Sequence, residues 1–172
     1  MILRDATQAD LPAINAIYNH CVLTSTCTFQ VTPATEAERH EWFTRCGQQH
    51  PVIVAEENCE VLAWGSLSPF HKREAYAGTV ENSVYVHHDH YRRGLGRSIM
   101  EELIRRARAR GIHSIIALIA AEQVGSIALH RALGFVEAGH LREVGVKFGR
   151  VLDVVYWQLL LGSSGHAVGE QQ

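Results

Sequence analysis

The most informative stretch of the sequence is Val84-Tyr85-Val86-His87-His88-Asp89-His90-Tyr91-Arg92-Arg93-Gly94-Leu95-Gly96, and a long amphipathic segment follows it. A β-rich run here ends in a basic, glycine-containing turn that opens a helix. Backbone N–H groups at a helix start have no intrahelical partners and carry the positive end of the helix dipole. Gly94 and Gly96 remove side chains, so a pyrophosphate can approach these groups closely. The stretch therefore predicts a strand–turn–helix unit that binds a nucleotide-bearing cofactor.

Two common phosphate-binding motifs do not fit this turn. The dinucleotide fingerprint G-x-G-x-x-G needs a third glycine where Ile99 stands. The Walker A motif G-x-x-x-x-G-K-[ST] does not occur in the sequence. What remains is close to R/Q-x-x-G-x-G/A, and Arg92, Arg93 and Arg97 add positive charge.

Composition indicates one soluble globular domain. The chain has 172 residues, of which 47% are hydrophobic and 20% charged. A net charge of −2 argues against nucleic-acid binding, which depends on neutralising phosphates. The sequence contains neither a transmembrane-length apolar run nor a basic-then-apolar leader, and its four cysteines lack metal-site spacing. We therefore expect a cytoplasmic protein with free thiols.

The hydrophobic pattern predicts a mixed α/β order. We expect strands at residues 2–4, 51–55, 61–64, 79–86, 115–119 and 151–161, and helices over 11–18, 36–45, 97–110 and 126–133. Thr7 with Asp10 and Thr35 with Glu38 have the spacing of helix-capping boxes. Residues 1–161 are expected to form the domain. Residues 162–172 are small and polar, and are expected to be a disordered tail.

An ordered set of short motifs resembles one enzyme family. The pieces are Tyr18-Asn19-His20, Thr24-Ser25-Thr26, Thr79–Val86, Arg93-Gly94-Leu95-Gly96, Leu129–Phe135 and Trp157-Gln158-Leu159. Across residues 2–161 the chain resembles the GNAT superfamily of acyl-CoA-dependent N-acetyltransferases, in its phosphinothricin and methionine sulfoximine acetyltransferase branch. The resemblance implies a mostly antiparallel sheet, splayed at its middle strands and flanked by helices. It also implies acetyl-CoA as acetyl donor, a small amino-acid-like acceptor, no metal and a homodimer.

The resemblance assigns the cofactor-binding residues. The main chain of Val86, His87 and His88 would hold the pantetheine arm and polarise the thioester carbonyl. The pyrophosphate would lie on the turn, at Arg92, Arg93, Gly94, Leu95, Gly96, Arg97 and Ser98. Gln123 and Ser126 would complete the site. Gln123 departs from the usual Asn, and Tyr91 from the usual Gln or Arg at the motif's first position.

Two side chains are candidates for proton transfer. By resemblance, Glu81 would accept the proton of the acceptor amine, directly or through water. His130 would face the departing sulfur as an acid, because imidazole can donate a proton near neutral pH. Their structural alternatives are an edge-strand surface charge for Glu81 and a half-buried helix histidine for His130.

The acceptor pocket is predicted mainly from the segment before Glu81. Arg73, Glu74, Ala75 and Tyr76 match a pocket loop of the family, and an arginine there can bind a carboxylate as a fork. The alternative for this loop is a solvated charged surface. Phe29 is expected to form an apolar wall, and Lys147 to lie in a late loop near the pocket. Ser83, Val84 and Tyr85 would form the floor.

The sequence leaves three alternatives to this function: a metal site, another acceptor and an acyl-CoA sensor. Strand alternation would place His87 and His88 of the His87-His88-Asp89-His90 run on opposite faces, which is poor geometry for chelation. The other functions are acetylation of a protein N-terminus or a polyamine, and an acyl-CoA sensor without turnover. The presence of both Glu81 and His130 argues against the sensor.

Overall fold

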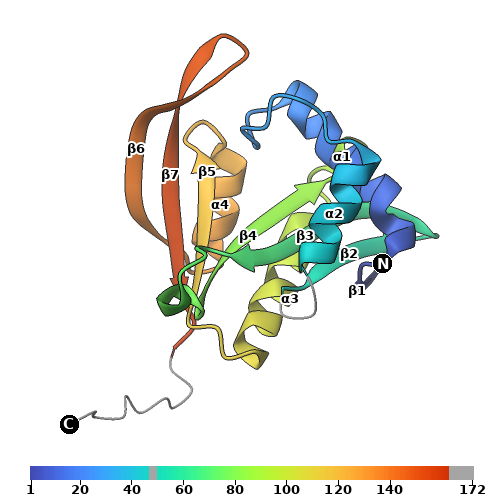
Figure 1. The fold of residues 1–172 in the computed structure, drawn as a ribbon, viewed down its shortest axis with the longest axis horizontal. Coiled ribbons are helices and arrows are strands. Elements are labelled where there is room, and N and C mark those ends of the chain that lie inside the picture. Colours follow the sequence, from blue (N-terminus) through green and yellow to red (C-terminus); the bar gives the residue numbers. More distant parts are fainter. Residues whose placement is uncertain (47–49, 163–172) are drawn as a thin grey trace.

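A computed structural model describes residues 1–46 and 50–162 and contains a seven-stranded sheet (Figure 1). The strand order is β1-β2-β3-β4-β5-β7-β6. The strands are β1 (Ile2–Asp5), β2 (Val52–Glu57), β3 (Glu60–Pro69), β4 (Thr79–Val86), β5 (Ser114–Ala120), β6 (Val136–Lys147) and β7 (Arg150–Leu160). The helices are α1 (Leu11–Thr24), α2 (Glu36–Cys46), α3 (Leu95–Ala109) and α4 (Val124–Ala132). Short 3₁₀ turns cover Gln8–Asp10, Glu74–Tyr76 and His88–His90.

The sheet confirms the predicted mixed, mostly antiparallel fold. Every neighbouring pair of strands is antiparallel except β4 and β5. These two parallel strands pair only from Thr79↔Ser114 to Glu81↔Ile116. Strand β4 continues to Val86 and β5 to Ala120, but the two strands no longer pair with each other beyond Glu81. They therefore diverge from this point. This divergence is the expected splay.

Local sequence explains why α3 starts and stops where it does. Gly94 precedes the helix with φ of 78°, and Gly111 follows it with φ of 71°, both in the left-handed region that favours glycine. One face of the helix is apolar and buried, at Leu95, Ile99, Met100, Leu103, Ile104 and Ala107. This face packs on the sheet because burial removes it from water.

Two hydrophobic clusters lie on the two faces of the sheet. The larger contains α3 together with residues such as Leu67, Ile115 and Trp157. The smaller lies under α1 and α2 and includes Ile14 and Trp64. In α2 the predicted cap is present: the Thr35 N–H donates to Glu38 Oε2 at 2.7 Å, and the Glu38 N–H donates to Thr35 Oγ1 at 3.2 Å. Helices α1 and α2 thus cover β3 and β4 on this face of the sheet.

Strand β6 was not expected from the sequence. Most of its 12 residues are exposed, so it lacks the apolar alternation that marks a half-buried strand. Its pairing with β7 shifts register between Glu137 and Gly139 and again between Leu141 and Gly145. Lys147 therefore ends a strand rather than lying in a loop. The β6–β7 hairpin stands on the side of the molecule away from α1 and α2 (Figure 1).

Three further expectations concern the C-terminal tail, membrane-spanning helices and the cysteines. The predicted disordered tail lies largely outside the described residues. Among the helices that the structure describes, none is long and apolar enough to cross a membrane. Cys21, Cys27, Cys46 and Cys59 are free thiols, as expected.

Candidate active site

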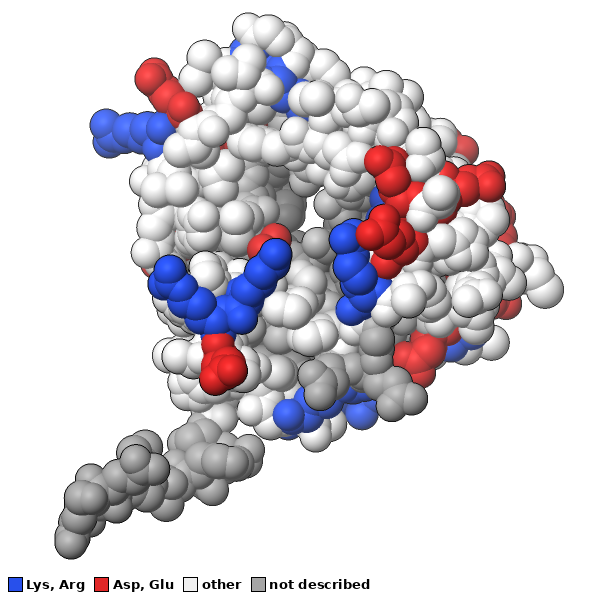
Figure 2. Space-filling model, viewed as in Figure 1, with Lys and Arg blue, Asp and Glu red and all other residues white. Residues whose placement is uncertain are grey.

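The splay between β4 and β5 opens into a cleft of about 840 Å³. Its wall consists of residues from the α1–α2 segment, β4, the 90–97 turn, β5 and the start of α4. Figure 2 shows a deep hollow at the centre of this view, with basic side chains on both sides of its lower rim. The cleft contains Glu81, Ser83, Val84, Tyr85, Val86, Arg92, Gly94, Leu95, Gly96, Arg97, Gln123, Ser126, His130 and Phe29. Most of the predicted site residues therefore meet in one cavity.

The turn before α3 presents bare backbone to the cleft. A side chain on Gly94 would meet nothing within 4 Å, and one on Gly96 would lie 3.5 Å from Leu129 and 3.7 Å from Val86. The Ser98 N–H donates to Gly94 O at 3.1 Å, which marks the first helical turn. The amides before Ser98 have no intrahelical acceptor. This is the donor set that a pyrophosphate needs.

The basic side chains of the turn differ in direction. Arg92 and Arg97 line the cleft, whereas Arg93 does not. Arg93 donates to Glu57 Oε2 at 2.7 Å and contacts His90 Nδ1 at 3.1 Å. The Ser98 hydroxyl is 3.4 Å from Gly94 O. Arg93 and Ser98 can thus contact a cofactor through their main-chain atoms. Contact through their side chains requires that they first leave these partners.

The main chain of β4 is available on the splay side at alternate residues. The His87 N–H donates to Leu62 O of β3 at 2.8 Å, and Val86 faces Ala63 in the register. In an antiparallel ladder, alternate residues turn their N–H and C=O groups to opposite sides. The amides of Val84 and Val86 therefore point away from β3, toward the splay. They can hold a pantetheine arm, whereas the His87 amide is already used.

The expectation that His87 and His88 point to opposite faces was wrong. β4 ends at Val86, and His87 caps a 3₁₀ turn over His88–His90. The two imidazole rings stack at 4.4 Å, and the ligand atoms of His87, His88 and Asp89 lie within 4.8 Å of one another. Strand alternation does not apply because the tight turn rotates successive side chains onto the same side.

Glu81 stands where β4 and β5 separate. It pairs with Ile116 at the last paired position and is half-buried in the cleft. Burial raises the pKa of the Glu81 carboxyl above its usual range, because desolvation disfavours the charged form. A carboxylate with a raised pKa is a stronger base, so it accepts a proton from an amine more readily near neutral pH.

His130 is buried and fixed by two partners. Its side chain is 3% exposed. Nδ1 lies 2.8 Å from Ser126 O, and since a carbonyl oxygen only accepts, Nδ1 carries the proton. Nε2 then accepts from Asn82 Nδ2 at 3.1 Å. Burial lowers the pKa of the His130 imidazole, so the neutral ring is favoured.

The segment after α1 is tied to two distant elements. Gln123 Nε2 donates to Thr26 Oγ1 at 2.9 Å, so this predicted cofactor residue is engaged with the protein itself. Lys147 Nζ is buried and donates to Ser25 O at 2.6 Å and Thr28 O at 2.7 Å. Phe29 packs on Gly145, and its ring occupies the space that an added Cβ would need. These contacts hold the wall of the cleft in place.

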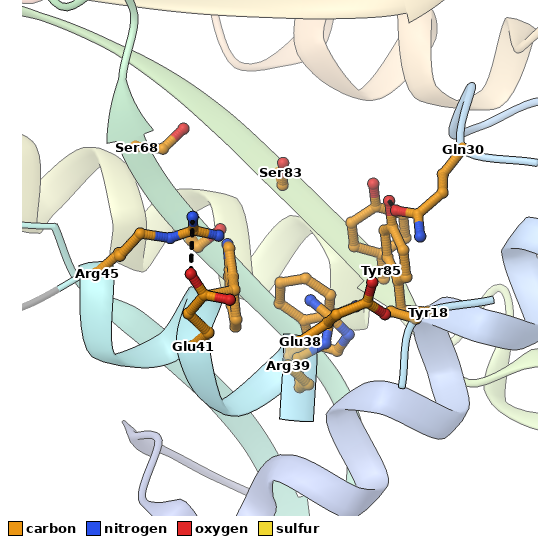
Figure 3. Close-up of a pocket in the computed structure, with 13 residues that line it drawn as sticks. Tyr18, Gln30, Glu38, Arg39, Glu41, Arg45, Ser68, Ser83 and Tyr85 are labelled. Carbon is orange, nitrogen blue, oxygen red and sulfur yellow. Dashed lines mark hydrogen bonds and ion pairs between the residues drawn. The ribbon is translucent and has the colours of Figure 1, made fainter. Parts of the chain in front are cut away.

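A second cavity, of about 440 Å³, lies between α2 and strands β3 and β4 (Figure 3). Ser83 and Tyr85 line both cavities, so the two spaces meet at β4. Sequence reasoning missed Arg39 and Trp64, which line the second cavity, and Asn82, which lines the cleft. Arg39 lies in a charged segment typical of a solvated helix, so the sequence carries no signal of its burial.

The predicted acceptor loop lies outside both cavities. Arg73, Glu74, Ala75 and Tyr76 form the β3–β4 connection, are exposed, and belong to neither lining. The Tyr76 ring packs edge-on against Phe70 at 5.8 Å. Contact of this loop with an acceptor stays a prediction.

Comparison with known proteins agrees with this geometry. The profile of the Acetyltransferase (GNAT) family matches residues 14–135. An L-methionine sulfoximine/L-methionine sulfone acetyltransferase of Pseudomonas aeruginosa is 45% identical over 161 residues, covering 92% of this chain and 94% of the relative.

Two solved structures are close in fold. A GNAT superfamily phosphinothricin acetyltransferase from Sinorhizobium meliloti in complex with acetyl-CoA has a TM-score of 0.91 and 39% identity, covering 94% of this chain and 88% of that one. A ribosomal-protein-alanine N-acetyltransferase from Brucella melitensis has a TM-score of 0.91 and 41% identity, covering 93% and 99%. The chain belongs to the GNAT family of acetyltransferases, and it is an N-acetyltransferase that takes its acetyl group from acetyl-CoA.

Proposed function

We propose that this enzyme acetylates the α-amino group of a small amino-acid-like acceptor of the methionine sulfoximine, methionine sulfone or phosphinothricin type. The observation that carries the proposal is the position of Glu81. It shares one face of β4 with Ser83 and Tyr85, because side chains alternate along a strand. Those two residues join the cofactor cleft to the second cavity. A small acceptor in the second cavity would thus have its amine beside the carboxyl.

The chemistry assigns each group a task. Acetyl-CoA supplies an acetyl thioester, and the bare turn at Gly94 and Gly96 fits its pyrophosphate. An amine is mostly protonated at pH 7, so it must lose a proton before it attacks. Glu81 accepts that proton, directly or through one water. The Val84 and Val86 amides on the splay side would donate to the pantetheine arm and to the thioester oxygen. As the amine nitrogen bonds to the acetyl carbon, the C–S bond breaks and CoA leaves as a thiolate that can take a proton from water.

The hydrogen bonds of His130 do not suit the general acid that the sequence predicts. Its only ring proton is on Nδ1 and is directed at Ser126 O. Nε2 is occupied by the Asn82 amide. For His130 to protonate the departing sulfur, the imidazole would first have to take up a second proton, which burial disfavours. We propose that His130 acts mainly by positioning Asn82 in the cleft.

A protein N-terminus is the second candidate acceptor. It is favoured by the name of the Brucella melitensis neighbour, a ribosomal-protein-alanine N-acetyltransferase. The two candidates separate in one assay of thiol release from acetyl-CoA. We expect turnover with methionine sulfone, methionine sulfoximine or phosphinothricin, and none with spermidine or peptides that begin with alanine. Turnover of the peptides alone would overturn the amino-acid proposal and leave the acetyltransferase activity standing.

We further propose a homodimer in the cytoplasm. Two-fold assemblies are the commonest among soluble oligomers. Light scattering of the purified protein should give twice the 19.2 kDa chain mass. A monomer mass across the working concentration range would contradict the dimer.

A further inference from the structure

The second cavity contains a buried cation, Arg39, that has no carboxylate partner among the residues that the structure describes. We infer that Arg39 binds an oxyanion of the acceptor, so that this cavity is the subsite for the acceptor's acidic group. The inference rests on the proposed function, since it names the group by which the same amino-acid-like acceptor is held. Its chemistry is that of a carboxylate or phosphinate on a planar guanidinium.

Arg39 is held rigidly by neutral groups. Its side chain extends from α2 and is 6% exposed. Nε donates to Asn15 Oδ1 at 3.1 Å, and the guanidinium carbon lies 4.5 Å from the Tyr18 ring centroid and 4.8 Å from that of Trp42. Such stacking orients the guanidinium and leaves its edge for in-plane hydrogen bonds.

No carboxylate within the described residues forms an ion pair with Arg39. The acidic groups that share its cavity have other partners. Glu38 accepts from the Thr35 N–H at 2.7 Å and from Thr35 Oγ1 at 2.9 Å. Glu41 pairs with Arg45 at 3.5 Å, as the dashed line in Figure 3 shows.

Burying a charge without a counter-ion lowers the free energy of unfolding. Arginine cannot avoid this cost by losing its proton, because its pKa stays too high even when burial lowers it. An anion that enters the cavity would offset the cost and would be bound by the guanidinium fork. The structure thus keeps a cation where a ligand can neutralise it.

The surroundings of Arg39 suit a small polar acceptor. Ser66, Ser68 and Ser83 line the cavity, and Figure 3 shows Ser68 and Ser83 on the strand side, across from the α2 side chains. The cavity therefore offers hydroxyl groups around the cation.

The register places this subsite within reach of the reaction. Ser68 faces Glu81 and Ser66 faces Ser83 across β3 and β4. Two residues along a strand span about 7 Å, so Ser83 lies about one small amino acid away from Glu81 on the same face. An acceptor can thus place its amine at Glu81 and an acidic oxygen toward Arg39.

The competing explanation is that Arg39 only braces the aromatic cluster. Arg39→Met keeps an unbranched apolar stem and removes the charge, and Arg39→Lys keeps the charge and removes the fork. Arg105→Met is the matched control, since Arg105 is an exposed helix residue outside both cavities. Melting temperatures of all variants report whether they are folded.

Steady-state kinetics with chosen acceptors tests the inference. In Arg39→Met we expect KM for L-methionine sulfone to rise about 10- to 100-fold, the range of a lost charged hydrogen bond. KM for acetyl-CoA should stay within twofold, and Arg39→Lys should recover part of the loss. The α-carboxamide of methionine sulfone separates two sources of the oxyanion: if the α-carboxylate is bound, the mutation removes the wild-type preference for the acid over the amide.

If the side-chain oxyanion is bound instead, KM should rise for phosphinothricin and not for methionine sulfone. A folded Arg39→Met enzyme with every acceptor KM within twofold of wild type would overturn the subsite. Failure of the wild type to acetylate any of these amino acids is a different result: it refutes the proposed function, and the subsite with it.

Discussion

The Asn82 amide meets the His130 imidazole across the cleft, with 3.1 Å between Asn82 Nδ2 and His130 Nε2. This contact joins β4 to α4, two elements whose facing residues are 48 positions apart in sequence. It also decides the protonation state of the imidazole, because Ser126 O already takes the other ring proton. Asn82 Oδ1 is buried and has no hydrogen-bond partner among the residues that the structure describes.

The neutral state of His130 makes stability depend on pH. The folded pKa lies below the ordinary value of 6.5, so the unfolded chain binds a proton more readily. We expect the free energy of unfolding to fall as the pH drops below about 6.5, and His130→Gln to weaken that dependence. Urea unfolding at pH 5.5 and 7.5 checks this. Equal pH dependence in the variant would mean that another group is responsible.

Glu81→Gln should separate catalysis from binding. We expect turnover to fall about 10²-fold or more, the usual scale for a general base, with acetyl-CoA affinity unchanged. Because burial raises the Glu81 pKa, the charged carboxylate destabilises the fold above that pKa. The variant should therefore melt at a higher temperature than wild type at pH 7.5, with a smaller gain at pH 5. Turnover within twofold of wild type from pH 6 to 9 would remove Glu81 from the mechanism.

Gly96→Trp should abolish cofactor binding without unfolding the chain. The new side chain would start 3.5 Å from Leu129 and 3.7 Å from Val86, inside the space between β4 and α4. Gly139→Trp is the control, since a side chain there meets nothing within 4 Å and lies outside the cleft. Isothermal calorimetry with acetyl-CoA should detect binding only in the control. Normal affinity in folded Gly96→Trp would place the pyrophosphate elsewhere.

Cys27 should be the most reactive thiol among the four cysteines. A hydrogen bond from the Cys21 thiol lowers the Cys27 pKa below its ordinary value, and Ser25 and the charge of Lys147 act in the same direction against the opposing effect of burial. We expect iodoacetamide to modify Cys27 at pH 7 faster than the exposed Cys59. Because Cys27 lines the cleft, acetyl-CoA should slow the reaction. Mass spectrometry of tryptic peptides measures both rates, and equal rates would contradict the prediction.

The features that the sequence predicts correctly depend on near neighbours along the chain. The turn and α3 follow from two glycines at positive φ and an apolar stripe with helical spacing. These signals lie within the turn or the helix that they predict. Glu81 is different, because its β-rich run alone favours a surface charge on an edge strand. Only the resemblance to the family singles it out as a candidate base.

Which side chains share a site depends on contacts between segments that are distant in the sequence. Arg93 and Glu57 pair across 36 positions, and Lys147 reaches Ser25 across 122. β6 is a strand because β7 offers it hydrogen bonds, although its exposed side chains show no pattern. Arg39 is buried because aromatic rings from α1, α2 and β3 close around it. Such partners are chosen by packing between distant segments, a free energy that no local spacing of residues records.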